Sequence, residues 1–141
     1  MIPGKSVMET VLYYSPEDPP YVSKLKGVMV RMGIRIKNVS AAQVMEQVGA
    51  LAGMKGFAKT WDQNEAPAQK EELPVIPEEV LVMCNFSSRR MDEFMMNLRK
   101  AGVPKIQLKA IVTETNCRWT FYHLYEEISE EHARMQKSSL S

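Results

Sequence analysis

The residues with the most recognisable chemical spacing are Cys84 and Arg90, which have five residues between them where a strand is expected to end and a helix to begin. This Cys-x5-Arg layout is typical of tyrosine-phosphatase phosphate loops, in which a thiolate attacks phosphorus and the arginine binds its oxygens. The intervening NFSSR contains no glycine, although such a loop turns its N–H groups inward through conformations that glycine favours. Met91 also replaces the hydroxyl residue that helps the thiolate leave. We therefore keep a phosphatase- or transferase-like enzyme only as an alternative.

A second polar cluster follows the apolar strand pattern in residues 108–119, LKAIVTETNCRW. Thr113 or Thr115 can cap the helix that we expect next, Asn116 can hold a turn, and Glu114 complements the helix dipole. Structural roles explain nearly every residue here, although the same corner can also face a ligand. The candidate ligand-binding residues come from this corner and from the loop after Cys84: Lys109, Thr113, Thr115, Asn116, Ser87, Ser88 and Arg90.

Other chemistries lack their usual patterns. His123 and His132 are nine positions apart, with no cysteine pair or carboxylate at metal-ligand spacing, so we expect no metal. No GxGxxG, GxxxxGK[ST] or GxSxG motif is present, so we expect no cofactor and assign no catalytic residue. The sequence thus favours a role without catalysis.

Length and charge narrow the classes further. The 141 residues suit a single domain, and 18 basic residues against 17 acidic ones argue against a nucleic-acid or anionic-membrane partner. No apolar stretch approaches the roughly 20 residues of a membrane helix, and the first residues do not resemble a signal peptide. Cys84 and Cys117 lack CxxC spacing, which fits a reducing cytoplasm.

The elements that would position these residues occur twice. Short strand-like runs begin at Val11 and Val80, and each is followed by a polar loop and by a helical apolar pattern that ends at glycine. Corresponding positions are separated by 69 residues, namely Val11, Val22, Leu25, Met29 and Gly33 in the first copy and Val80, Met91, Phe94, Leu98 and Gly102 in the second. This regularity predicts a duplicated unit.

A second strand and a second helix complete each copy. The strands are IRIKNV and VPKIQLKAIV, and Ser40 with Gln43 has the spacing of a capping box. The apolar helix positions are Ala41, Val44, Met45, Val48 and Leu51 in the first copy and Trp119, Tyr122, Tyr125 and Ile128 in the second. We predict one domain over 1–141, with repeats at 9–52 and 78–132. Residues 53–77 form a loop or linker in which Phe57 and Trp61 contact the surface, and 133–141 form a flexible tail.

The predicted fold is α/β, a duplicated βαβα unit forming a four-stranded, mainly parallel sheet in the order 2-1-3-4 with helices on both faces. The alternative is an α+β arrangement of two pseudo-symmetric halves. In an open parallel sheet a ligand binds beyond the carboxyl ends of the strands. We therefore expect residues 15–20 and 85–90 to border one polar rim.

The second half resembles a bacterial family known only as domain of unknown function 3783. The resemblance covers about residues 78–132 and rests on MDEFMMNLRKAGV, on LYEEISEEH, and on three short motifs: Leu108-Lys109-Ala110, Thr113-Glu114-Thr115-Asn116 and Trp119. It implies no activity, cofactor or partner. It does favour a role beyond structure for Lys109, Thr113, Thr115 and Asn116.

Three functions remain. The main hypothesis is a small cytoplasmic module that binds a small anionic molecule or a protein without chemistry. The enzyme that uses Cys84 and Arg90 is the second. The third is an oligomerisation or interaction module that uses Phe121, Tyr122 and Tyr125 of the last helix, which leaves a homo-oligomer open.

Overall fold

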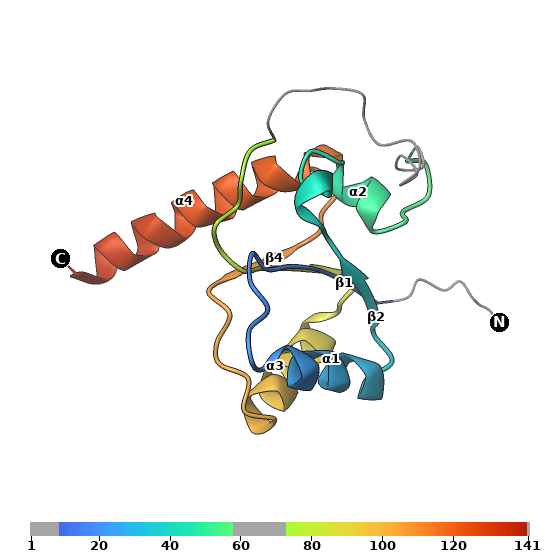
Figure 1. The fold of residues 1–141 in the computed structure, drawn as a ribbon, viewed down its shortest axis with the longest axis vertical. Helices are drawn as coiled ribbons and strands as arrows, with labels where there is room; N and C mark the ends of the chain where they lie inside the picture. Colours follow the sequence, from blue (N-terminus) through green and yellow to red (C-terminus); the bar gives the residue numbers. More distant parts are fainter. Residues whose placement is uncertain (1–8, 58–72, 141) are drawn as a thin grey trace.

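A four-stranded sheet forms the centre of the molecule (Figure 1). The computed structural model describes residues 9–57 and 73–140, with side chains as far as Met135. The strands are β1 (Thr10–Tyr14), β2 (Arg35–Asn38), β3 (Val80–Cys84) and β4 (Leu108–Ile111), in the order β2-β1-β3-β4. The predicted α/β class and strand order are confirmed.

Helices cover both faces of the sheet (Figure 1). Helices α1 (Val22–Arg31) and α3 (Ser88–Lys100) lie on one face, and α2 (Val48–Leu51) and α4 (Phe121–Leu140) lie on the other. Because every residue of β1 and β3 is buried, each strand feeds two apolar cores, one beneath each helix layer. Helix α4 continues to Leu140, so residues 133–140 are helical where we expected a flexible tail. No helix in the described part of the chain is long and apolar enough to cross a membrane.

The direction of the central strand pair corrects the predicted sheet. β1 pairs in parallel with β2, and β3 in parallel with β4, but β1 and β3 are antiparallel, with Thr10 opposite Cys84. A helical crossover enforces parallel strands only within each βαβ half, and the longer connection from β2 to β3 permits either direction. The carboxyl ends of β1 and β3 therefore point in opposite directions. Residues 15–20 and 85–90, which follow these two strands, do not share a rim.

The duplicated register holds in the helices but not in the strands. Leu25 and Met29 of α1 pack in the same apolar cluster as Phe94 and Leu98 of α3, 69 positions later. Val11 also packs in this cluster, whereas Val80 packs in the cluster on the opposite face. Because side chains alternate between the two faces of a strand, the offset between β1 and β3 differs from the predicted 69 positions by an odd number of residues. A pseudo-twofold axis that relates the two halves would place β1 and β3 antiparallel, as observed. The duplication of the unit stays a prediction.

The predicted helix after Ser40 is broken into two short pieces. A 3-10 turn at Ala41–Gln43 is closed by the expected capping box, in which Ser40 N donates to Gln43 Oε1 at 3.1 Å. Gln47 is then extended, forms a bridge with Thr120, and is followed by α2. Long-range backbone pairing therefore interrupts a helical apolar pattern.

Helix α4 begins later than predicted. A 3-10 turn at Asn116–Arg118 precedes it, and the Thr120 hydroxyl accepts from His123 N at 3.0 Å. Thr120 therefore has the capping role that we assigned to Thr113 or Thr115. The predicted glycine ends of α1 and α3 are confirmed, because Gly33 and Gly102 both have positive φ angles, 73° and 88°.

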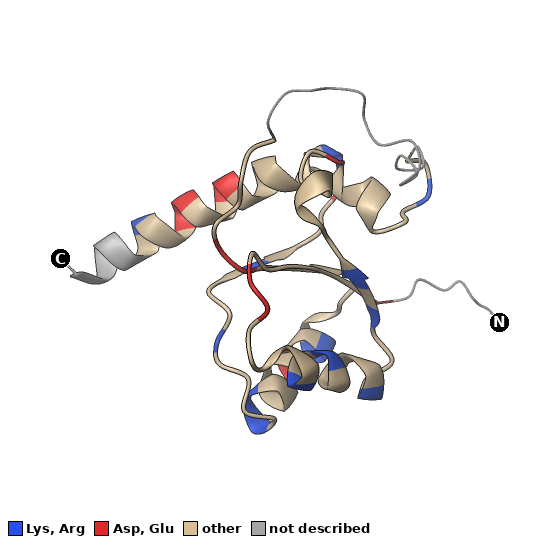
Figure 2. Ribbon diagram, in the orientation of Figure 1, with Lys and Arg blue, Asp and Glu red and all other residues tan. Residues whose placement is uncertain are grey.

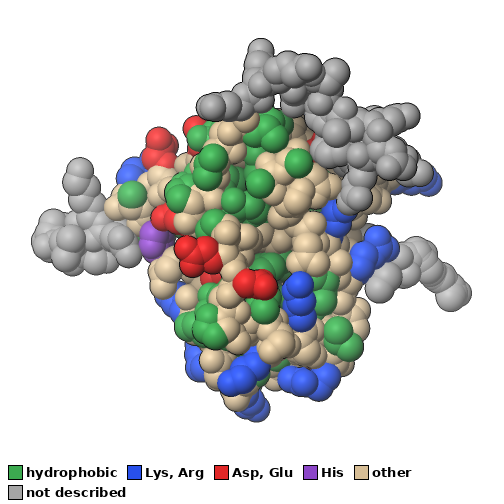
Figure 3. All heavy atoms as spheres, in the orientation of Figure 1, with side chains coloured by type: hydrophobic (Ala, Val, Ile, Leu, Met, Phe, Trp, Pro, Cys, Tyr) green, Lys and Arg blue, Asp and Glu red, His purple; other side chains and the backbone are tan. Residues whose placement is uncertain are grey.

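Charges are segregated although the net charge is near zero. Helix α1 carries Lys24, Lys26 and Arg31 and no acidic residue, and the middle of α4 carries the acidic residues Glu126, Glu127, Glu130 and Glu131 (Figure 2). In the space-filling view, lysine and arginine side chains gather over the end of the molecule formed by α1 and α3 (Figure 3). Helix α1 and the middle of α4 thus carry net charges of opposite sign.

Candidate functional site

A cleft of about 560 Å³ lies beyond the carboxyl ends of the parallel strands β3 and β4. It is larger than the cleft beside α1, about 320 Å³, and the one beneath α4, about 400 Å³. Both halves of the chain contribute to its lining, which consists of Met54, Phe57, Cys84, Asn85, Val112, Thr113, Glu114, Cys117 and Arg118. Its position agrees with the general rule that ligands of open α/β sheets bind outside strand carboxyl ends.

Asn85 gives this cleft its most unusual backbone. Its φ angle of 69° is the one positive value at a non-glycine residue in the described ranges. Asparagine tolerates this left-handed conformation better than most residues, yet the conformation still costs free energy. Backbone of this kind is concentrated at ligand-binding and catalytic sites. Asn85 follows β3 directly, so the turn redirects the chain at the cleft wall.

A hydrogen-bonded turn builds the opposite wall. Thr113 N donates to Asn116 Oδ1 at 2.8 Å, and Asn116 N donates to Thr113 Oγ1 at 3.0 Å. Asn116 Nδ2 also donates to Ile111 O at 2.9 Å, so this buried amide joins the turn to the end of β4. Cys117 N donates to Thr113 O at 3.0 Å. These bonds hold Thr113 and Glu114 at the rim of the cleft with little freedom.

The segment after α2 supplies an apolar wall. Met54 and Phe57 line the cleft, and the Phe57 ring lies against Gly49 of α2. A Cβ on Gly49 would stand 2.5 Å from the Phe57 ring, closer than van der Waals contact permits. Gly49 thus allows the ring to pack against α2. Trp61, which we expected to contact the surface with Phe57, lies outside the described residues.

Two thiols and one cation complete the lining. Cys84 and Cys117 are both free and buried, and burial, followed by the proximity of Cys117, raises the pKa of the Cys84 thiol. The neutral thiol is therefore favoured, and it is a poor nucleophile. Arg118 is exposed and takes part in no ion pair within the described ranges, which leaves its guanidinium for a ligand. No group of three or more His, Cys, Asp or Glu side chains there is placed to hold a metal ion.

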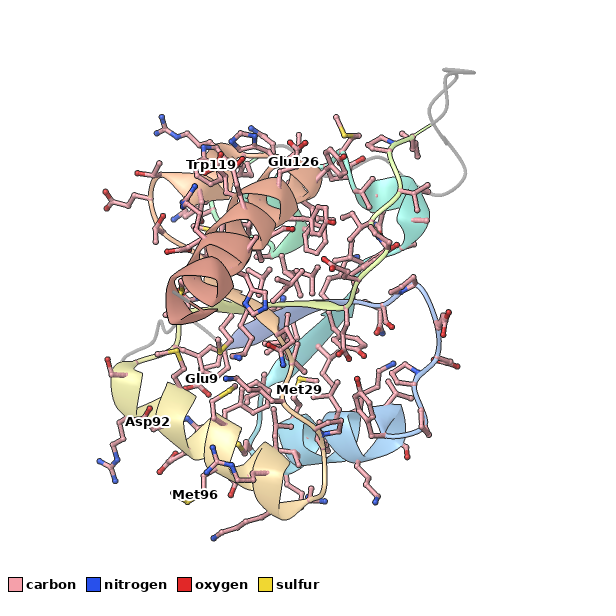
Figure 4. All side chains as sticks on the ribbon, turned by 90° about the vertical axis from the view of Figure 1, so that its left-hand side faces the viewer. Glu9, Met29, Asp92, Met96, Trp119 and Glu126 are labelled. Atoms are coloured by element: carbon pink, nitrogen blue, oxygen red, sulfur yellow. The ribbon has the colours of Figure 1, made fainter. Side chains whose placement is uncertain are left out.

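Arg90 lies away from this cleft, in an ion-pair network. It donates to both carboxylate oxygens of Glu9, at 2.8 and 2.7 Å, to Glu93 at 3.0 Å and to Met32 O at 2.7 Å. Glu9 precedes β1 and lies between the sheet and α3 (Figure 4). The hydrogen bond to Glu9, followed by the one to Glu93, raises the pKa of Arg90. The guanidinium is fully engaged, so Cys84 and Arg90 do not form a phosphate loop.

The remaining predicted residues are dispersed. Ser87 caps α3 by accepting from Arg90 N at 3.1 Å, and Ser88 and Thr115 are exposed outside the cleft. Lys109 Nζ donates to Ile106 O at 2.6 Å, and burial, with Lys105 second, lowers the pKa of Lys109. Lys109 and Asn116 border the cleft beneath α4. Of the seven predicted residues, Thr113 alone lines the larger cleft.

A smaller cleft lies at the other end of the strands, beyond the carboxyl ends of β1 and β2. Tyr13 and Tyr21 both donate to the carboxylate of Glu79, the latter at 2.8 Å. Burial, followed by the bond to Glu79, raises the pKa of both phenols, that of Tyr21 to about 12. Of these residues Tyr13 lines the cleft, together with the acidic Glu17 and Asp18 and the basic Lys26. The clefts at the two ends of the strands therefore differ in charge and in polarity.

Sequence patterns did not indicate Met54, Phe57 or Arg118 as site residues, and they included Asn85 only as part of the expected 85–90 rim. Asparagine directly after a buried strand was the one local signal, because it tolerates left-handed backbone. The others reach the cleft through tertiary packing.

Comparison with known protein families finds a match in the second half of the chain. The model of the family described as a domain of unknown function (DUF3783) matches residues 79–135, which span β3, α3, β4 and most of α4. The predicted resemblance is thus confirmed. No curated protein and no solved structure matches the chain. Cys84, Asn85, Thr113 and Arg118 lie within the matched segment, whereas the apolar wall from Met54 and Phe57 lies outside it.

Proposed function

We propose that this chain, whose residues 79–135 match the model of the family described as a domain of unknown function (DUF3783), is a non-catalytic module that binds a small molecule beyond β3 and β4. The supporting observation is that the left-handed turn at Asn85 lies in the larger cleft, at the carboxyl ends of two parallel strands. We further propose a cytoplasmic location, which suits two free buried thiols, and an origin of the two halves by duplication.

The lining indicates the chemistry of the ligand. Met54, Phe57 and Val112 offer an apolar surface, and the rim offers the exposed Arg118 guanidinium. A small molecule with an apolar body and one carboxylate fits this combination, because the body leaves water and the carboxylate pairs with arginine. Glu114 on the same rim disfavours more highly charged anions.

Catalysis has less support. Arg90 is bound by Glu9, Glu93 and the Met32 carbonyl, and the raised pKa of Cys84 disfavours a thiolate. We expect no turnover by the wild-type protein in a broad phosphatase screen. Turnover that disappears in Cys84→Ala would contradict the non-catalytic proposal.

Binding can be tested by ligand-observed NMR with hexanoate and phenylacetate, alongside their neutral amides. We expect the carboxylates to bind better than the amides. Thr113→Val and Arg118→Gln should weaken carboxylate binding by about three- to tenfold, the value of one hydrogen bond or charge contact. Thr115→Val is the matched control, because Thr115 is exposed two positions away, outside the cleft. Equal binding to all variants would place the ligand elsewhere.

A further inference from the structure

Three sulfur-bearing side chains line the larger cleft, and each comes from a different part of the chain. Cys84 ends β3, Cys117 lies in the 3-10 turn before α4, and Met54 lies in the segment after α2. Both cysteines of the 141-residue sequence are among them, so the fold brings every thiol of the chain to one cleft. The expectation of no metal came from ligand spacing along the sequence, whereas these side chains meet through folding.

The two thiols are held on fixed backbone. Cys84 pairs with Thr10 in the central ladder, and Cys117 N donates to Thr113 O at 3.0 Å. Besides burial, the proximity of Cys117 raises the pKa of Cys84, so the two sulfur atoms lie within electrostatic range of each other. Cys117 Sγ donates to Glu114 O at 3.3 Å. That contact uses the thiol proton and leaves the sulfur lone pairs for another partner.

Met54 brings a third sulfur to the same cleft. Its N–H donates to Gly49 O at 2.9 Å, and the preceding Gly53 has a positive φ angle of 75°, so the backbone direction at this point is fixed. The side chain is partly buried against the apolar cluster that contains Cys84. A thioether has no proton to lose, so it can add a soft ligand to two thiolates without adding charge.

The kind of ligand atom indicates which metal ion suits the cleft. Thiolate and thioether sulfur select Cu(I), whereas Mg²⁺ and Ca²⁺ prefer oxygen. Structural Zn²⁺ takes four ligands, chiefly thiolate and imidazole. Neither His123 nor His132 lines this cleft, and no third His, Cys, Asp or Glu in the described ranges joins the two thiols in a metal-binding group. Two thiolates and one thioether suit Cu(I), which accepts low coordination numbers.

We propose that the larger cleft binds one Cu(I) ion through Cys84 Sγ, Cys117 Sγ and Met54 Sδ. Each thiol releases its proton to water as its S–Cu bond forms. Copper enters as Cu(I), so no electron is transferred. Burial favours the protonated thiols of the metal-free protein, but a coordinating metal ion deprotonates a thiol outright.

This site is distinct in chemistry from the carboxylate ligand proposed above. The copper ligands include the two buried thiols, and the carboxylate is assigned to the exposed Arg118 on the rim. The inference therefore goes beyond the proposed function. Hexanoate binding by the metal-free protein tests that function alone, and copper binding without hexanoate tests this one.

Anaerobic titration of the reduced full chain with Cu(I), in competition with bicinchoninate, tests the site. We expect one equivalent per chain and an ultraviolet thiolate-to-copper charge-transfer band. Cys84→Ala and Cys117→Ala should each weaken binding by at least about a hundredfold, because a direct ligand contributes no less than the roughly 10–100-fold of an outer-shell partner. Circular dichroism verifies that both variants fold.

X-ray absorption at the copper edge counts the sulfur ligands and tests the thioether. We expect three sulfur atoms in the wild type and two in Met54→Leu, with affinity weakened by about tenfold. Met96→Leu is the matched control, because Met96 is 53% exposed on α3, outside the cleft, and should leave both values unchanged.

Several results would overturn the proposal. One is a chain that takes up no Cu(I) in the competition, and another is half an equivalent with dimers in sedimentation velocity, since the ion would then bridge two chains. Unchanged affinity in a folded cysteine variant, or equal effects of Met54→Leu and Met96→Leu, would also contradict it.

Discussion

The two faces of the sheet are covered in different ways. On one face, α1 and α3 are regular amphipathic helices, and Arg90 joins α3 to Glu9 before β1 and to the Met32 carbonyl after α1. The groove between these helices has a volume of only about 260 Å³. On the other face, a four-residue helix, two 3-10 turns and the start of α4 enclose two larger clefts.

This difference suggests a division of roles between the layers. In the regular layer, most backbone hydrogen bonds form within the two helices, and the side chains of Ser87 and Arg90 bond to backbone groups at the helix ends. The irregular layer depends on side chains such as Asn116, whose amide accepts from Thr113 N and donates to Ile111 O, and Thr113, whose hydroxyl accepts from Asn116 N. The α1 and α3 layer therefore serves mainly stability, and the candidate sites lie in the α2 and α4 layer.

The largest effect is expected from a matched pair of core truncations. Phe94 and Phe121 are both fully buried, one beneath each layer. Phe94→Ala and Phe121→Ala should each lower the free energy of unfolding by about 3–5 kcal/mol, as measured by urea denaturation. Only Phe121→Ala should also weaken hexanoate binding by the folded protein. The reverse pattern would contradict the division between the layers.

The ion-pair network of the regular layer comes next. Arg90→Met leaves the partly buried Glu9 carboxylate without its bidentate partner. We expect a lower melting temperature, by less than for either phenylalanine truncation. Arg99→Met is the control, because Arg99 is exposed in the last turn of the same helix. If both variants have the same melting temperature as the wild type, the network does not stabilise the layer.

A pair of glycine substitutions compares the layers more finely. Gly27 lies within α1, where a Cβ would meet only Arg31 at 3.5 Å, so Gly27→Ala should stabilise the protein by about 0.5–1 kcal/mol. Gly49→Ala gains the same helix preference but displaces the Phe57 ring, so we expect a smaller gain or a loss. Thermal unfolding measures both. Hexanoate binding should change only for Gly49→Ala. Unchanged binding in both variants would show that Phe57 does not contact the ligand.

The smallest effect is expected at alkaline pH. Below pH 9.0, the ordinary pKa of a cysteine thiol here, both the folded and the unfolded chain keep the Cys84 proton. Above it, the unfolded chain ionises first because burial raises the pKa of Cys84 in the folded state, so the free energy of unfolding falls as pH rises. Cys84→Ala should flatten this fall above pH 9.0, as followed by urea denaturation. An identical slope in the variant would show that the thiol does not contribute.

The sequence predicts the local elements of this fold well. The helices and the glycine ends of α1 and α3 follow from apolar periodicity and turn chemistry within each half, whereas the strand order was chosen as the simplest assembly of two such units. The direction of β3 relative to β1 could not be predicted in this way, because nothing in residues 53–77 requires β3 to run parallel to β1. The predicted common rim was wrong for this reason alone.

The site was harder to predict because its residues depend on distant partners. Arg90 suited an anion in the sequence, but Glu9 binds it from 81 positions away. Asn116 suited a ligand or a turn, and the structure places it within the turn. The apolar wall of the cleft comes from Met54 and Phe57, which no local pattern connects to β3 and β4.

The antiparallel centre of the sheet also has a kinetic consequence. Pairing of Thr10 with Cys84 and of Tyr14 with Val80 closes chain loops of roughly 70 residues, whereas each βαβ half closes through local contacts. Joining β1 to β3 therefore demands the longest conformational search in the molecule. We expect the docking of the two halves, rather than helix formation, to limit the folding rate.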